Sequence, residues 1–120
     1  MTLLGLIAGG CQSELEIFGV QHVLDVAGLP ACRQQHRVLL PDGPVLLDAA
    51  WPEVELAVEL DGAAFHGSPE ARERDLRRDA ALAAAGWIVL RFSYRRLTRN
   101  PAACRAQIRA VYERRLGIAP

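Results

Sequence analysis

The 120-residue sequence contains no lysine, and all fourteen of its basic residues are arginine. A site on this chain that needs a permanent positive charge must therefore take it from arginine or from a bound cation. Fourteen acidic residues balance the arginines, so the formal net charge is zero. The total charge alone indicates no partner.

Cysteine is scarce as well, and long hydrophobic runs are absent. Cys11, Cys32 and Cys104 have no metal-binding spacing and are odd in number, so they predict neither a zinc site nor a disulfide framework. Residues 1–10 are apolar, but the run is short and lacks basic residues, so it predicts neither a signal peptide nor a membrane span. We expect a cytoplasmic protein that does not enter a membrane.

Repeats and low-complexity linkers are also missing, and half of the residues are hydrophobic. This composition predicts one globular domain over residues 13–116, with an N-terminal segment 1–12 and a tail 117–120. Apolar periodicity, capping residues and turn residues predict helices over 13–27, 69–85 and 101–116, and strands over 33–40, 44–51, 54–61 and 87–92. The predicted fold is α/β, with a mixed four-stranded sheet flanked by helices in the order αβββαβα.

Charge is unevenly distributed along the chain. Residues 1–86 carry six arginines and thirteen acids, a net charge of −7, whereas residues 87–120 carry eight arginines and one acid, a net charge of +7. A basic end on an acidic body suggests an anionic partner. The alternative is that the arginines of the last helix are simply solvated.

Three carboxylates fall on two neighbouring predicted strands. Glu59 and Asp61 alternate with apolar residues on the strand 54–61, which gives that strand one apolar and one acidic face. Asp48 lies on the preceding strand, and a turn at Pro52-Glu53 places it near Glu59. Such an oxygen-rich cluster suits Mg²⁺ or Mn²⁺. The alternative is that the carboxylates are merely solvated at a sheet edge.

These motifs, taken in order, resemble the PD-(D/E)xK nuclease superfamily, and most closely its small bacterial domains similar to very-short-patch-repair (Vsr) endonucleases. The resemblance implies a restriction-endonuclease-like fold and a metal-dependent endonuclease acting on DNA. The residues that carry it are Ser13 to Glu16, Leu47-Asp48, Ala57 to Gly62 with His66, Arg74-Asp75 with Arg77-Arg78, and Gly86-Trp87 through Leu90-Arg91-Phe92.

The resemblance also implies a metal site. Asp48 and Glu59 would be its acidic ligands, and the backbone carbonyl of Leu60 a third oxygen. Asp61 occupies the position at which the superfamily usually has lysine. An aspartate cannot supply the positive charge of that lysine. It could bind a second metal ion, and this ion would supply the positive charge.

Two further candidates depend on the resemblance. His66 is either a general acid/base or phosphate ligand, or a polar loop residue. Glu16 is the capping-box partner of Ser13, an acid that reaches a water at the metal, or both. Either Gln34 or Gln35 could face the site from the first strand.

Several arginines are candidates for nucleic-acid contacts. Arg78, and with it Arg77, could face phosphates, although Asp75 at i−3 of Arg78 offers a simple salt bridge instead. Arg91 lies in an apolar strand and needs a partner, for which the acidic cluster is one candidate. A predicted loop holds three more arginines for the phosphate backbone. These are Arg95, Arg96 and Arg99.

Three functions remain as hypotheses. The first is a metal-dependent DNA endonuclease. The second is a non-catalytic nucleic-acid-binding or regulatory module, such as an antitoxin-like component that works with an upstream or separate DNA-binding or toxin–antitoxin partner. The third is a structural domain in which Asp48→Asn only relieves repulsion. The chain could be free-standing or part of a longer protein, and its oligomeric state is undetermined.

Overall fold

A computed structural model describes residues 20–61 and 67–117 of the chain. Its four strands form one sheet in the order β1-β2-β3-β4, antiparallel except for the parallel pair β3–β4. This confirms the predicted α/β fold with a mixed four-stranded sheet. The elements are η1 (Val20–Leu24), β1 (Arg33–Leu40), β2 (Gly43–Trp51), η2 (Pro52–Val54), β3 (Leu56–Asp61), α3 (Pro69–Ala84), β4 (Ile88–Ser93), α4 (Tyr94–Arg99) and α5 (Pro101–Leu116).

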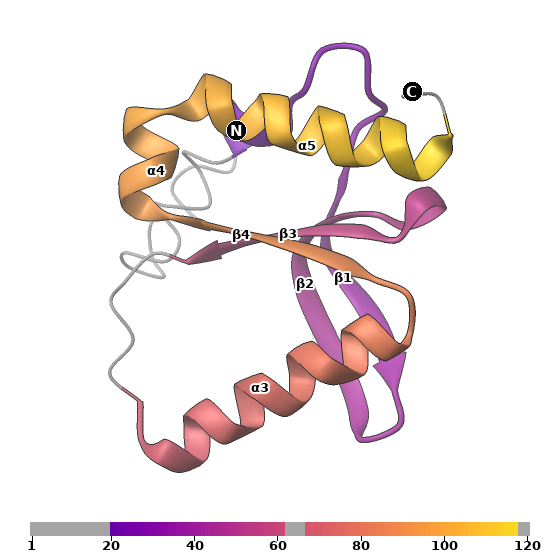
Figure 1. Ribbon diagram of the computed structural model, residues 1–120, viewed down its shortest axis with the longest axis vertical. Helices are drawn as coiled ribbons and strands as arrows, with labels where there is room; N and C mark the ends of the chain where they lie inside the picture. Colours follow the sequence, from indigo (N-terminus) through magenta and orange to yellow (C-terminus); the bar gives the residue numbers. More distant parts are fainter. Residues whose placement is uncertain (1–19, 62–66, 118–120) are drawn as a thin grey trace.

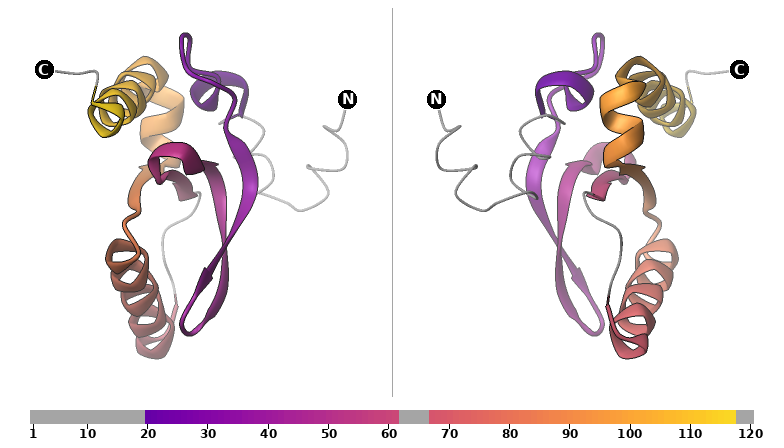
Figure 2. Two further views of the ribbon diagram at one scale, coloured as in Figure 1. Left: turned by 90° about the vertical axis from the view of Figure 1, so that its right-hand side faces the viewer. Right: turned by 90° about the vertical axis from the view of Figure 1, so that its left-hand side faces the viewer.

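The sheet lies between two helical layers. Figure 1 shows α5 along one face of the sheet and α3 along the other, and the β1–β2 hairpin reaches past β3 to lie beside α3. The side views in Figure 2 show the same arrangement, with the twisted hairpin opposite α3. The helix between β3 and β4 makes the crossover that their parallel pairing requires.

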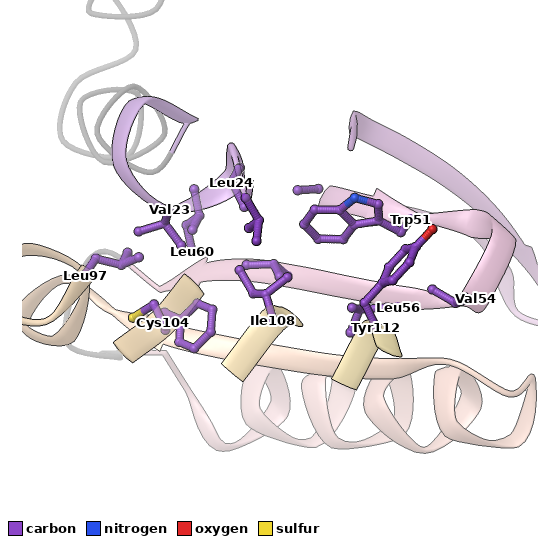
Figure 3. Packing of buried hydrophobic residues seen from close by; sticks show 14 residues of the cluster. Val23, Leu24, Trp51, Val54, Leu56, Leu60, Leu97, Cys104, Ile108 and Tyr112 are labelled. Carbon is purple, nitrogen blue, oxygen red and sulfur yellow. The ribbon is translucent and has the colours of Figure 1, made fainter. Parts of the chain in front are cut away.

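Two buried clusters hold these layers together. The larger one joins η1, the sheet, α4 and α5 around Trp51, whose indole N–H donates to the Pro30 carbonyl at 2.8 Å. Figure 3 shows its side chains converging between the sheet and α5. The smaller cluster joins the hairpin to α3 through Leu40, Leu47 and Leu82. None of the described helices is long and apolar enough to cross a membrane.

Strand β3 is central, and both of its faces are covered. Leu56, Val58 and Leu60 belong to the larger cluster, on the α5 side of the sheet. Ala57 belongs to the smaller cluster, on the α3 side. The predicted alternation is therefore present. The alternative of a solvated acidic face does not hold for Glu59, which is buried where α3 packs over the sheet. Leu56 to Leu60 are all buried, and only Asp61 is exposed.

Local signals explain most element boundaries. Ser68 caps α3, since its hydroxyl accepts the Ala71 N–H at 3.1 Å, and Pro69 occupies the first turn. Gly86 follows α3 with a φ of +98°, which only glycine adopts without strain.

The first helix differs from the prediction: within the described residues it is a single π-helical turn that ends at Leu24. Its predicted start, residues 13–19, lies outside them.

The predicted loop of three arginines is wrong, because residues 94–99 form the short helix α4. Ser93 caps it, and its hydroxyl accepts the Arg96 N–H at 3.1 Å. A serine directly before Tyr94 is a recognisable N-cap signal. The continuous apolar strand before it and the Asn100-Pro101 helix start after it left only six residues between them, too few for a periodic pattern to stand out.

Tyr112 offers a direct test of the α5 layer. Its buried hydroxyl donates to Glu53 Oε2 at 2.9 Å, and its ring meets Trp51 edge-on. Burial, and then the Glu53 carboxylate, raise the pKa of Tyr112. The hydroxyl is a donor at neutral pH even without this shift. We expect Tyr112→Phe to lower the free energy of unfolding by about 1 kcal/mol in urea denaturation. Tyr94→Phe, at an exposed site, is the control, and equal stability of the two variants would contradict this role.

Candidate functional site

The two predicted metal ligands meet where the β2–β3 ladder ends. The last backbone pair is Ala49 with Val58. One step further along the same register, Asp48 faces Glu59, and side chains replace the ladder bonds. The Asp48 N–H donates to Glu59 Oε2 at 2.9 Å, and the Leu60 N–H donates to Asp48 Oδ2 at 2.8 Å. Each carboxylate is thus fixed by a main-chain N–H of the opposite strand.

The β1 side of Asp48 is also irregular. Gln35 falls opposite Asp48 in the β1–β2 register but is left out of the ladder. Its φ is +50°, a left-handed conformation that costs a non-glycine residue of the order of 1 kcal/mol. Leu47 and Ala49 are two residues apart, so a regular strand would point both side chains to the same face. Leu47 instead packs in the smaller cluster, next to α3, and Ala49 packs in the larger cluster, next to α5. The regular strand pattern is therefore interrupted at this residue.

Glu59 is the only buried charged side chain among the described residues, with 8% of its surface exposed. Arg78 of α3 reaches it, with its Nη2 at 2.6 Å from Glu59 Oε1 and 3.2 Å from the Leu46 carbonyl oxygen. Arg78 thus pairs with Glu59 rather than with Asp75, the simple helical partner. A buried carboxylate needs such a counter-charge.

Asp61 does not join the pair. It is exposed at the end of β3, opposite Ser93 of β4, and it lines a separate hollow with Asp75 and Asp79. Among residues 20–61 and 67–117, no group of three or more His, Cys, Asp or Glu side chains is placed to hold a metal ion. Of the predicted cluster of three carboxylates, the structure brings only Asp48 and Glu59 together.

Arg91 has a partner that sequence reasoning did not name. Its Nη2 lies 2.6 Å from Asp79 Oδ1 of α3, although its Cα neighbour across the sheet is Glu59. Burial alone would lower the pKa of Arg91, but Asp79, then Glu59 and Asp75, raise it above its ordinary value. Arg91 is therefore a fixed cation next to the carboxylate pair. Asp79 could have been suspected only by placing α3 over β4.

The remaining candidates are spread more widely. Arg95 and Arg99 are exposed on α4, and the guanidinium of Arg96 lies 5.3 Å from the centre of the buried Phe92 ring. Gln34 is exposed on β1. Glu16 and His66 lie outside the described residues, so their placement relative to Asp48 is not part of the structure.

The donor set nonetheless suits a hard divalent cation. Asp48 and Glu59 are oxygen ligands from adjacent strands, and Mg²⁺ is usually bound through one or two carboxylates, with waters and substrate phosphates completing its shell. A carboxylate offers about four lone-pair positions, so the bond from Arg78 to Glu59 does not exhaust it. The two residues fit part of a Mg²⁺ or Mn²⁺ site.

Sequence comparison relates this chain to two longer mycobacterial proteins. The chain is 28% identical over 105 residues to two uncharacterized Mycobacterium tuberculosis proteins, MT2308 of strain CDC 1551 / Oshkosh and Rv2248 of strain H37Rv. The match covers 87% of this chain but only 37% of each relative, so the chain spans little more than a third of their length. No solved structure matches significantly.

A family model covers the site itself. The model named REase_MTES_1575 matches residues 45–111, more than half of the chain, from β2 into α5. This range contains the carboxylate pair, Asp61 and the arginines of α3, β4 and α4. The chain therefore belongs to the REase_MTES_1575 family, a restriction-endonuclease-like family.

Proposed function

We propose that this chain is a metal-dependent endonuclease domain that hydrolyses phosphodiester bonds in DNA, of the branch similar to very-short-patch-repair endonucleases. The observation that carries the proposal is the pair Asp48–Glu59, held by reciprocal backbone bonds at the end of the β2–β3 ladder. A solvated sheet edge does not account for it, because Glu59 is buried on a central strand.

Each residue of the site would have its own role in hydrolysis. A divalent cation such as Mg²⁺ or Mn²⁺, when bound, would polarise the scissile phosphate and lower the pKa of a water. Asp48 and Glu59 would hold it, with the Leu60 carbonyl as a further oxygen. His66 and Glu16, if they reach the same place, would move a proton or orient the water.

Positive charge would come from arginine in place of the missing lysine. Arg91, fixed as a cation by Asp79, lies on the strand next to Glu59 and would offset charge that develops on the phosphate. Asp61, at the usual lysine position, would bind a second cation. We assign contacts with the phosphate backbone to four further arginines, which are Arg78, Arg95, Arg96 and Arg99.

One observation favours a non-catalytic alternative. Arg78 already neutralises Glu59, and the described residues hold no third His, Cys, Asp or Glu side chain grouped with the pair. A module that kept the fold but used this ion pair structurally would bind nucleic acid without cleaving it. Because the relatives are much longer, an upstream or separate DNA-binding or toxin–antitoxin partner fits either function, and we place both in the cytoplasm.

Calorimetric titration of Mg²⁺ and Mn²⁺ tests the proposal, with plasmid nicking measured on the same samples. We expect binding at millimolar concentration or below, and nicking that stops when EDTA removes the ion. Metal binding without cleavage of any nucleic acid would favour the non-catalytic module. If no divalent ion binds, the nuclease proposal is wrong.

A further inference from the structure

Helix α3 presents two chemically different faces. Arg74, Arg77, Arg78 and Ala81 are spaced i, i+3, i+4 and i+7, so they share one face. That face lines a hollow between α3 and the turn of the β1–β2 hairpin. The other face is acidic and lines the separate hollow near Asp61 described above. We call the first hollow the arginine groove. Its hairpin side is formed by Leu40, Asp42, Gly43, Pro44 and Val45.

The arginine groove is a positive site in the acidic part of the chain. Three of the six arginines in residues 1–86 line it, against a single acid, Asp42. Arg74 and Arg77 are exposed and form no ion pair with any described residue. Glu70 and Glu73 lie one turn before them on α3 but are not paired with them, and neither acid lines the groove. Neighbouring guanidinium groups that face such a hollow suit an anionic ligand.

The groove leads to the carboxylate pair through Arg78. This side chain lines the groove, yet its Nη2 also contacts the Leu46 carbonyl and Glu59 Oε1. Arg78 therefore connects the groove to the carboxylate pair. The walls opposite the arginines are mostly apolar, so they offer few groups that could read bases.

We propose that the arginine groove holds the phosphates of the nucleic acid that flank the scissile phosphate, with Arg74 and Arg77 as their contacts. The proposal rests on the proposed nuclease function and adds to it a second contact surface, distinct from α4. Phosphate contacts of this kind position a strand without selecting its sequence.

Fluorescence anisotropy with a labelled DNA duplex in EDTA, across a range of salt concentrations, tests the groove without cleavage. The double variant Arg74→Gln/Arg77→Gln is expected to weaken binding about tenfold, and the slope of log K against log[salt] should become shallower by roughly 2. The control variant Arg109→Gln/Arg114→Gln removes two charges from α5, on the opposite layer, and should bind within about twofold of the wild type.

A second pair of substitutions separates charge from folding. Arg74→Lys/Arg77→Lys should keep the wild-type salt slope, because both charges remain, and its melting temperature serves as a folding check. A double glutamine variant with wild-type affinity and slope would overturn the groove while leaving the nuclease proposal intact. Absence of any binding by the wild type in EDTA would also overturn the groove, whereas the nuclease proposal is decided separately by metal binding and nicking.

Discussion

Asp48→Asn is expected to lower plasmid nicking by more than roughly 100-fold. Substitution of residues that only hydrogen-bond the ligands of a metal site lowers metal affinity or activity about 10–100-fold, and loss of a ligand itself should cost more. Calorimetry on the same samples should show loss of Mg²⁺ and Mn²⁺ binding. The physical reason is the charge. Asn is nearly isosteric with Asp, but a neutral amide oxygen is a much poorer ligand for a hard cation than a carboxylate.

The substitution is chosen because it spares the local fold. Asp48 Oδ2 accepts the Leu60 N–H, and an asparagine oxygen can accept the same bond. The bond from the Asp48 N–H to Glu59 involves only the backbone of residue 48. The melting temperature should therefore stay the same or rise as repulsion with Glu59 is relieved. Asp25→Asn, at an exposed position near η1, removes the same charge elsewhere and should change neither measurement.

The result separates the three hypotheses. A variant that is more stable but nicks DNA and binds metal like the wild type would contradict the role of Asp48 as a metal ligand and support a purely structural role for this residue. If Asp48→Asn loses metal binding and the wild type does not cleave DNA, the non-catalytic module is the remaining hypothesis.

The hairpin was the most predictable part of the site. A turn at Pro52-Glu53 and period-two alternation are local properties, and together they fix the register that sets Asp48 opposite Glu59. The interruption of the strand pattern at Asp48 was not predictable, because glutamine has no marked preference for the left-handed conformation that Gln35 adopts.

The environment of the carboxylates depends on contacts distant in sequence. Alternating polar residues suggest a solvated face, and only the packing of α3 over β3 shows that Glu59 is buried. The same packing makes Glu59, and not Asp75, the partner of Arg78, and gives Arg91 its bond to Asp79. Local spacing on a helix identifies candidate ion pairs, but tertiary burial decides which of them form.

Arg78→Ala is expected to lower the free energy of unfolding by about 3 kcal/mol in urea denaturation, because it leaves a buried carboxylate without its counter-charge. The side chain of Glu59 is 10% exposed and that of Arg78 23%, so solvent screens the pair only weakly. Arg77→Ala, at the exposed position next to it on α3, should change stability by less than about 0.5 kcal/mol.

The double variant Arg78→Ala/Glu59→Gln isolates the charge. It should recover part of the loss, because the buried charge is gone, and a double-mutant cycle then gives the coupling between the two residues. Strictly additive effects would contradict a direct pairing.

Addition of Mg²⁺ connects this ion pair to the proposed function. A divalent cation held by Asp48 and Glu59 would supply the positive charge that Arg78→Ala removes, and binding to the folded state alone stabilises it. Millimolar Mg²⁺ should therefore raise the melting temperature of Arg78→Ala more than that of the wild type, and not at all when Asp48→Asn is also present. Equal shifts in all three proteins would show that Arg78 and the cation do not act on the same carboxylate.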